Sequence, residues 1–313
     1  MLKIIFAGTP EFSAQHLNEL IKSKYNIVAV LTKPDQPSGR GNQTTFSPVK
    51  KIAKKHNIPI FQPNILNYSI QSSLSCFNAN IMIVVAYGLI LPKIILNMFP
   101  MGCINIHASL LPRWRGPSPI HSALLAGDKF TGITIIKMDN NIDTGDILYS
   151  RKCNITNIDT TKSLTKKLIQ LGIQCILVTL TNIIKKIVIY QRQDHLISTY
   201  SKKIQKIDAK INWNNEAQVI DRMIRAYNPW PISYFIIHNI RIKIFKAQII
   251  PNYIYKEKCI GKILSINKEG INIQTATDII QIQEIQFPGK KIITSIDIYN
   301  SKKKWFIPES ILK

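Results

Sequence analysis

The stretch Cys103–Pro117, with the sequence CINIHASLLPRWRGP, decides how this chain is interpreted. It begins as a short β-prone run and continues into a loop that carries proline and arginine. Side chains two residues apart on a strand project from the same face, so Asn105 and His107 are expected to point together. An amide beside an imidazole suits a reaction in which a carbonyl oxygen gains negative charge and a proton changes hands.

The residues before this stretch predict a parallel α/β domain. Lys3–Ala7 has the pattern of a buried strand, and Ile27–Thr32 has the pattern of a second one. Between them a helix is predicted, with Thr9 as its N-cap and proline in its first turn. A β-α-β opening is typical of parallel sheets. Its first turn holds neither G-x-G-x-x-G nor G-x-x-x-x-G-K, which argues against NAD and ATP as ligands.

A further strand is predicted at Ile81–Ala86, and it is followed by Tyr87-Gly88-Leu89. Open α/β sheets bind ligands in the crevice outside the carboxyl ends of their strands. The segment after this strand is therefore a candidate for ligand contact.

A third polar residue, Asp143, lies in the tight acidic turn Asp139–Asp146, after a predicted strand at Thr131–Met138. Because neighbouring strands of a parallel sheet end at the same edge, we expect Asp143 to reach His107 and orient its imidazole. Taken singly, a histidine on a strand is commonly structural, and an aspartate in a turn commonly caps that turn. The combination is less ordinary.

No activated nucleophile accompanies these residues. Cys103 shares the face of Asn105 and His107 but lies in no nucleophile motif. The set therefore favours direct transfer to an external amine over a covalent enzyme intermediate.

The C-terminal part reads as a second domain. A helix is predicted at Thr160–Lys186. The residues after it are polar and charged and show no regular apolar pattern, which makes them a candidate linker. A helix at Asn215–Tyr227 and several short strands between Ser233 and Ile285 follow. Short strands separated by polar turns indicate a small β-barrel or sandwich.

The 313 residues carry a formal charge of +23, which nominates a polyanionic partner such as nucleic acid or a membrane surface. An Ile-, Asn- and Lys-rich composition explains the charge equally well as compositional drift. The five cysteines form no C-x-x-C pair, which predicts neither a zinc site nor a disulfide framework and favours a reducing compartment. No uninterrupted apolar run approaches the ~18 residues that a membrane span needs.

The polar segment Lys33–Pro48 contains prolines and glycines and is predicted to hold no regular element. Loops of this length are lids, binding loops or solvated tips, and the sequence leaves these readings open. Arg40, between two glycines, is expected to be presented rather than packed.

With these residues identified, a resemblance becomes visible. Ile104–Gly116 resembles the Asn-x-His-x-Ser-Leu-Leu-Pro-x-(aromatic)-Arg-Gly signature of the folate-dependent formyltransferases, and Gly132–Asp146 is similar to a second signature of that family. The segments KPDQPSGRG at Lys33–Gly41, VVAYGLILP at Val84–Pro92 and IRAYNPWP at Ile224–Pro231 narrow the resemblance to the members that act on methionyl-tRNA. The similarity runs nearly end to end.

The resemblance implies a Rossmann-like, mostly parallel sheet domain at residues 1–189, a linker at 190–207 and an OB-like, tRNA-binding β-barrel domain at 208–313. It implies that the formyl group of 10-formyltetrahydrofolate passes to the free amino group of methionine on initiator methionyl-tRNA. The product, N-formylmethionyl-tRNA, would serve translation initiation. A cytoplasmic monomer that needs no metal, no membrane and no stable protein partner is expected.

The same resemblance assigns roles to the residues that match its signatures. The residues implied in catalysis are Asn105, His107 and Asp143. Those implied to border the folate are Ser109, Leu110, Leu111 and Pro112. The backbone implied to meet the pterin edge belongs to Val85, Ala86, Tyr87, Gly88 and Leu89. Arg40 matches the arginine that approaches the acceptor end of the tRNA.

Other readings remain open from the residues. A formyltransferase for a small amine, such as a sugar nucleotide or purine precursor, would share Asn105, His107 and Asp143 but has little use for a basic surface or a C-terminal barrel. A formyl-folate hydrolase is a weaker alternative. An RNA-binding protein on a retired catalytic scaffold would explain the charge and the barrel, but it leaves the three polar residues as a coincidence.

Overall fold

The structure, a computed structural model, describes residues 2–38, 43–252 and 259–312. Contacts within the chain divide it into two compact units. Unit 1 consists of Met1–Pro119, Phe130–Asn154 and Thr165–Ser201, and unit 2 of Ile120–Lys129, Ile155–Leu164 and Lys202–Lys313. Arg40 and its two flanking glycines lie outside the described residues.

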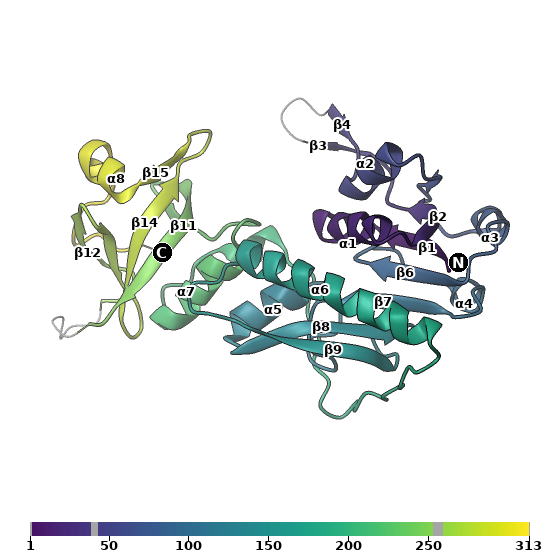
Figure 1. Cartoon of the computed structure of the whole chain (residues 1–313). Helices are drawn as coiled ribbons and strands as arrows, with labels where there is room; N and C mark the ends of the chain where they lie inside the picture. Colours follow the sequence, from purple (N-terminus) through teal and green to yellow (C-terminus); the bar gives the residue numbers. More distant parts are fainter. Residues whose placement is uncertain (1, 39–42, 253–258, 313) are drawn as a thin grey trace. The chain divides into compact units, whose positions relative to one another are not determined.

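Unit 1 is built on a seven-stranded sheet in the order β5-β2-β1-β6-β7-β8-β9 (Figure 1). Its strands are β1 (Lys3–Gly8), β2 (Asn26–Leu31), β5 (Ile60–Phe61), β6 (Ile81–Val85), β7 (Cys103–His107), β8 (Phe130–Lys137) and β9 (Ile147–Asn154). The first five strands of this order pair in parallel, whereas β8 is antiparallel to both β7 and β9. The predicted Rossmann-like, mostly parallel sheet is confirmed.

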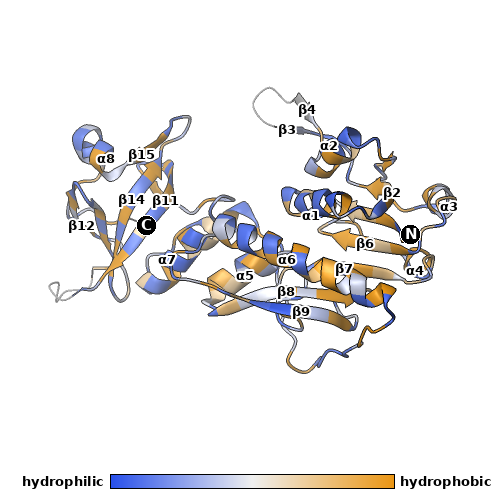
Figure 2. Cartoon of the chain, viewed as in Figure 1, coloured by the Kyte–Doolittle hydropathy of each residue, from blue (hydrophilic) through white to orange (hydrophobic). Residues whose placement is uncertain are grey.

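Helices pack against both faces of this sheet. They are α1 (Glu11–Lys22), α2 (Pro48–Lys55), α3 (Tyr68–Ser75), α4 (Lys93–Leu96) and α6 (Thr161–Ile184), whose first turn belongs to unit 2. Ile5 and Ala7 join a buried apolar cluster with residues of α3 and α4. Ile4 and Phe6 are fully buried on the other face, because alternate residues of a strand point to opposite sides. The inner strands β6 and β7 are accordingly hydrophobic along most of their length, whereas the edge strand β9 is largely hydrophilic (Figure 2).

Two local predictions in unit 1 are wrong. Thr9 does not cap α1: the N-cap is Pro10, and the Thr9 hydroxyl donates instead to the carbonyl of Tyr87, 3.0 Å away. The segment Lys33–Pro48 is not free of regular structure, because β3 (Gln36–Ser38) pairs antiparallel with β4 (Gln43–Thr45). Proline at position 37 is tolerated there because edge strands can leave one side unpaired.

Unit 2 contains a six-stranded antiparallel sheet in the order β10-β11-β14-β13-β12, with β15 also paired to β14. These strands are β10 (Tyr234–Ile237), β11 (Ile240–Ile250), β12 (Ile263–Asn267), β13 (Gly270–Gln274), β14 (Ile279–Gln286) and β15 (Ile292–Thr294). The unit also holds α5 (Pro119–Ala126), whose first residue belongs to unit 1, together with α7 (Ala217–Ala226), α8 (Ser295–Ser301) and two short 3₁₀ turns at Lys206–Ala209 and Lys303–Trp305. The predicted OB-like second fold is confirmed as a curled antiparallel sheet.

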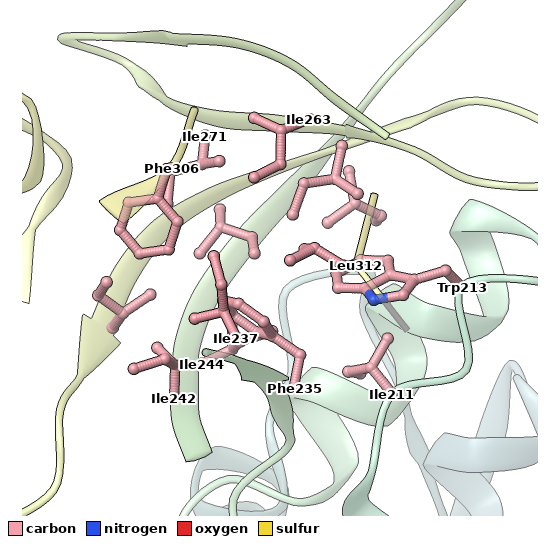
Figure 3. Close-up of a cluster of buried hydrophobic side chains, with 14 of the residues drawn as sticks. Ile211, Trp213, Phe235, Ile237, Ile242, Ile244, Ile263, Ile271, Phe306 and Leu312 are labelled. Atoms are coloured by element: carbon pink, nitrogen blue, oxygen red, sulfur yellow. The ribbon is translucent and has the colours of Figure 1, made fainter. Parts of the chain in front are cut away.

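The concave side of this sheet is filled by isoleucines and aromatic rings (Figure 3). Phe235 lies with its ring centroid 5.9 Å from that of Trp213 and 6.4 Å from that of Phe306. Such inclined arrangements are the favoured geometry for aromatic pairs, so the three rings tie β10 to the segments before α7 and after α8.

The helix α6 is long and apolar enough to cross a membrane by length and composition, with mean hydropathy 1.6. Its buried residues include Leu164, Leu168, Ile176 and Leu180. A core helix with one buried apolar stripe can be equally long and apolar, so the length and composition of α6 are weak evidence for a membrane span.

Candidate active site

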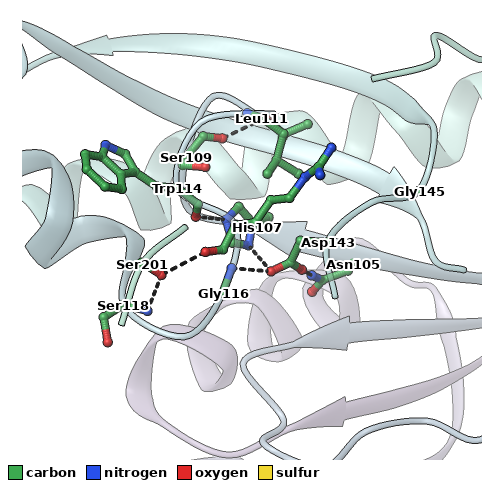
Figure 4. Close-up of polar contacts among 12 residues, drawn as sticks. Asn105, His107, Ser109, Leu111, Trp114, Gly116, Ser118, Asp143, Gly145 and Ser201 are labelled. Atoms are coloured by element: carbon green, nitrogen blue, oxygen red, sulfur yellow. Dashed lines mark hydrogen bonds and ion pairs between the residues drawn. The ribbon is translucent and has the colours of Figure 1, made fainter. Parts of the chain in front are cut away.

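The end of β7 carries the polar pair expected from the sequence. His107 is buried, and its Nε2 lies 2.9 Å from the carbonyl oxygen of Trp114 in the loop that follows (Figure 4). A carbonyl only accepts hydrogen bonds, so Nε2 carries a hydrogen and donates to it. Asn105 is half-buried on the same face of the strand.

The carboxylate of Asp143 lies between these side chains (Figure 4). Its Oδ1 accepts a hydrogen bond of 3.1 Å from the Asn105 amide, and its Oδ2 accepts one of 2.8 Å from the backbone N–H of Gly116. The same Oδ2 is 3.5 Å from Nδ1 of His107. Acceptor oxygens therefore face both ring nitrogens of His107. The structure brings Asn105, His107 and Asp143 together.

The reason given for this proximity needs correction. We expected Asp143 to follow a strand parallel to β7, but β8 runs antiparallel to β7, with Lys137 opposite Ile104 and Thr134 opposite His107. The carboxyl end of β8 therefore lies at the beginning of β7. The turn Asp139–Asp146 has to run back along β7 to deliver its carboxylate to the other end.

That returning turn is held by its own hydrogen bonds. The carboxylate of Asp139 accepts from the backbone N–H of Asn141 at 3.1 Å and from the hydroxyl of Thr144 at 2.7 Å. Asp143 has a φ of 55°, in the left-handed region that non-glycine residues rarely adopt. A residue held in such a conformation costs about 1–3 kcal/mol and persists only where its surroundings determine it.

The segment Ser109–Pro112, predicted to border the folate, turns directly after β7. Its backbone is fixed by Thr134 of β8, whose hydroxyl donates to the carbonyl of Ser109 at 2.7 Å and accepts from the N–H of Leu111 at 3.0 Å. The Ser109 hydroxyl donates to the carbonyl of Arg113 at 2.5 Å. Ser109 and Leu111 are buried, whereas Leu110 and Pro112 are partly exposed.

The segment Val85–Leu89 leaves the carboxyl end of β6, as the sequence predicted. Ala86 and Gly88 are exposed and have φ values of 44° and 87°. The carbonyls of Val85 and Tyr87 accept hydrogen bonds from the hydroxyls of Ser13 and Thr9. The Tyr87 ring points into the core, where burial raises the pKa of its phenol to about 12. The accessible backbone of this segment is therefore that of Ala86 and Gly88, with Leu89 partly exposed beside them.

Cys103 is excluded as a nucleophile by its surroundings. It is 1% exposed, and burial raises the pKa of its thiol to about 12. Only the thiolate is an effective nucleophile, so this thiol is inert near neutral pH. Over residues 2–38, 43–252 and 259–312, no three His, Cys, Asp or Glu side chains gather as the ligands of a metal ion would.

The sequence reasoning missed the segment Gln191–Ser201, which lies in the predicted linker but belongs to unit 1. Its backbone pairs with the loop after β7: the N–H of Arg115 donates to the carbonyl of Thr199, and the N–H of Ser201 donates to the carbonyl of Arg115. The Ser201 hydroxyl accepts from the N–H of Ser118 (Figure 4). Its polar residues gave no periodicity by which this role could be found.

Arg115 is the second residue that was missed, since it is 1% exposed although it is charged. Its guanidinium donates twice to Oε1 of Gln193, at 3.1 and 2.7 Å, and once to Nδ1 of His195 at 3.1 Å. A further hydrogen bond of 3.3 Å reaches the hydroxyl of Tyr200 and lowers the pKa of that phenol. A buried arginine without a carboxylate partner is rare, and here neutral acceptors satisfy its donors.

Comparison with known proteins places this chain and its fold in one class of proteins. The family "Formyl transferase" matches residues 2–180, and "Formyl transferase, C-terminal domain" matches residues 203–303. The crystal structure of WlaRD, a sugar 3N-formyl transferase in the presence of dTDP and 5-N-formyl-THF, has the same fold. It superposes with a TM-score of 0.66 at 21% identity, over 93% of this chain and 99% of that one.

Relatives with higher sequence identity show which formyltransferases this chain resembles closely in sequence. A methionyl-tRNA formyltransferase of Buchnera aphidicola subsp. Schizaphis graminum is 55% identical over 306 residues, which are 97% of each chain. That of Buchnera aphidicola subsp. Acyrthosiphon pisum (strain APS) is 51% identical over 312 residues, 99% of each chain. The chain belongs to the methionyl-tRNA formyltransferase family.

Proposed function

We propose that this protein transfers the formyl group of 10-formyltetrahydrofolate to the free amino group of methionine on initiator methionyl-tRNA. The observation that carries the proposal is the convergence of Asn105, His107 and Asp143 at the end of β7. The near full-length identity to methionyl-tRNA formyltransferases supports the choice of acceptor. The formylated tRNA would then serve translation initiation in the cytoplasm.

Asn105 stabilises the charge that develops on the formyl oxygen as the amine attacks. One hydrogen of its amide is engaged by Asp143, which fixes the orientation of the side chain and leaves the second hydrogen for the substrate. A preorganised donor of this kind typically contributes about 10²–10³ in rate.

His107 supplies a second donor and a proton. In this conformation its Nε2–H is engaged by the carbonyl of Trp114, so it reaches the formyl oxygen by exchanging that acceptor. Asp143, at Nδ1, holds the ring in place and balances its positive charge. The α-amino group, with a reference pKa of ~7.7–8.0, attacks in its neutral form.

Protons balance over the reaction. The new bond joins the amine nitrogen to the formyl carbon, and the bond from that carbon to N10 of the folate breaks. One proton leaves the amine and one reaches N10. His107 and Asp143 form the titratable pair through which this exchange passes, directly or by one water. Since the group is transferred directly, the chemistry assigned to the protein requires no metal.

The residues around the donor site fit a flat heterocycle with a polar edge. The exposed backbone of Ala86 and Gly88 would meet the pterin edge, together with the neighbouring Val85, Tyr87 and Leu89. Ser109, Leu110, Leu111 and Pro112 would form the opposite border, held in place by Thr134. A sugar formyl transferase of the same fold, crystallised in the presence of 5-N-formyl-THF, supports a folate-derived donor.

We further propose that residues 1–189 form the catalytic domain and residues 208–313 a tRNA-binding domain. Residues 190–207 would connect them, with the first part of this connection, Gln191–Ser201, packed within unit 1. Arg40, outside the described residues, would approach the acceptor end of the tRNA. The net charge of +23 supports a polyanionic acceptor, because phosphate contacts dominate the affinity of nucleic-acid complexes. We expect the protein to act as a monomer without a membrane or a stable protein partner.

The proposal is tested by incubating the protein with 10-formyltetrahydrofolate and charged initiator tRNA, and by searching the hydrolysed product for N-formylmethionine. His107→Ala and Asp143→Ala should each abolish transfer, because both remove the proton-carrying pair. Free methionine and an amino sugar nucleotide serve as competing acceptors, and buffer alone serves as the control without an acceptor. Faster transfer to the amino sugar would establish a small-amine enzyme, and formate release without an acceptor would establish a hydrolase. Wild-type rates in either variant would reject the site.

A further inference from the structure

The amide of Gln193 bridges two parts of unit 1 that are distant in the sequence. Its Nε2 donates to the backbone carbonyl of Asp143 at 2.9 Å and to that of Gly145 at 2.7 Å. Its Oε1 accepts two hydrogen bonds from Arg115. Two carbonyls on one side and a guanidinium on the other allow only this orientation of the amide. All four hydrogen-bonding positions of the side chain are used, and the residue is 6% exposed.

Arg115 is fixed in turn, so the bridge has a rigid base. Its side chain is almost fully buried, and its backbone N–H and C=O both pair with the segment Gln191–Ser201. The beginning of that segment is anchored to the start of β9, because Ile147 and Gln191 exchange two backbone hydrogen bonds of 2.8 and 2.9 Å. Gln193 is thus held both through its backbone neighbours and through its side chain.

The turn that carries Asp143 needs such support. It is not paired with β7, and Asp143 holds a left-handed backbone conformation. At Gly145 the turn is packed so closely that a Cβ atom would lie 1.7 Å from the carbonyl oxygen of Lys137. The two carbonyls that Gln193 binds flank Thr144 and lie directly behind the catalytic carboxylate of the proposed function.

We propose that Gln193, held by Arg115, is a positioning residue that sets the place of the Asp143 carboxylate against Asn105 and His107. This inference rests on the proposed function, because it assigns Gln193 a role through Asp143. Gln193 touches no reacting atom. Loss of its two donors would leave both carbonyls without those partners and would free the turn to move, and a displacement of about 1 Å in a catalytic group can cost about 10²-fold in rate.

The test is Gln193→Glu. A glutamate keeps the length of the side chain and its contact with Arg115, now as a charge-assisted pair, but it replaces both donors to the turn by an acceptor oxygen. We expect kcat of formyl transfer to fall about 10–100-fold with KM for tRNA and for the formyl donor changed less than about threefold. Gln71→Glu is the matched control, since Gln71 of α3 also donates to a backbone carbonyl, that of Leu66 at 2.9 Å. It should leave kcat unchanged.

A double-mutant cycle separates positioning from general destabilisation. If Gln193 acts through Asp143, the double variant Gln193→Glu, Asp143→Asn should lose no more single-turnover rate than Asp143→Asn alone. Hydrogen exchange gives a second readout: the amide of Gly116, bonded to Oδ2 of Asp143, should exchange faster in Gln193→Glu. Should Gln193→Glu not fold, Gln193→Asn withdraws the amide by one methylene and tests the same contacts.

The outcomes are distinct. A wild-type kcat in Gln193→Glu, an unchanged exchange rate at Gly116, or additive losses in the double variant would each overturn the positioning role. Full turnover by Asp143→Asn, or no formyl transfer by the unmodified protein, would instead reject the proposed function. A fall in kcat with unchanged KM, faster exchange at Gly116 and non-additive losses together support the inference.

Discussion

Acidification should destabilise unit 1 through one buried histidine, His16 of α1. The side chain is fully buried, with its Nδ1 2.7 Å from the carbonyl of Phe12. Nδ1 must carry the hydrogen of this bond, and Nε2 has no partner among the residues that the structure describes. Nε2 instead faces Gly172 of α6, where a Cβ atom would lie 2.4 Å away. A proton on Nε2 would be buried without an acceptor.

Burial accordingly lowers the pKa of His16 from 6.5 to about 4. A lowered pKa in a base means that the folded state favours the neutral form, so stability is present above the unfolded pKa of 6.5 and is lost as the pH falls towards 4. The full difference corresponds to about 3 kcal/mol, and about 2 kcal/mol of it is lost between pH 7.5 and pH 5.

The measurement is urea unfolding at pH 7.5 and pH 5, followed by the fluorescence of Trp114, with Trp213, Trp230 and Trp305 replaced by phenylalanine in every protein compared. His16→Gln removes the titration, so its free energy of unfolding should fall by about 2 kcal/mol less over this interval than that of the parent. His56→Gln, at an exposed histidine after α2, is the matched control and should follow the parent. Parallel pH dependence of the parent and His16→Gln would refute the reasoning.

Two further predictions follow from buried groups near β7 and β8. Thr134→Val leaves the carbonyl of Ser109 and the N–H of Leu111 without a partner hydroxyl. The free energy of unfolding, measured by thermal unfolding, should fall by about 1–3 kcal/mol per group, and the rate of formyl transfer should fall as well. Thr134→Ser keeps the hydroxyl and should retain both stability and rate. Because burial raises the pKa of the Cys103 thiol, Cys103 should resist alkylation at pH 8 in the folded protein, whereas the exposed Cys76 should react. Peptide mass mapping measures the two modifications, and equal labelling of both thiols would contradict the burial of Cys103.

The parts of the fold that the sequence predicted are those with a clear period. β1 and β6 are short apolar runs between turn residues, and each ends within a residue of its predicted end; β7 (Cys103–His107) is the strand expected to carry Asn105 and His107. Alternation along β7 also placed Asn105 and His107 on one face, which the structure confirms. Elements too short to show a period, such as β5 and α4, were missed because two to four residues carry no pattern.

The site was predicted less completely because its support is not periodic. Arg115 was recognised only as part of a signature, since a charged side chain in a loop is normally exposed. Gln193 lies in the polar segment QRQDHLISTY, which has the composition of a solvent-exposed linker. Leu196 and Ile197 of this segment are in fact exposed. Hydrogen bonds of an irregular segment depend on partners far away in the chain, and a single sequence does not display them.

The direction of β8 explains why the turn that carries Asp143 is held by hydrogen bonds from other segments. A side chain at the carboxyl end of a parallel strand is placed by the sheet itself, as Asn105 and His107, the proposed catalytic residues, are on β7. Asp143 follows an antiparallel strand and returns to the site on a turn that the sheet holds at its end, beyond Asp143, where the N–H of Lys137 donates to the carbonyl of Asp146. Besides the bond from Asn105 of β7, its position depends on hydrogen bonds from outside the sheet: Asp139 from within the turn, Gly116 from the loop after β7, and Gln193 from the segment Gln191–Ser201. Substitutions in that segment should consequently affect the rate of transfer more than the affinity for either substrate.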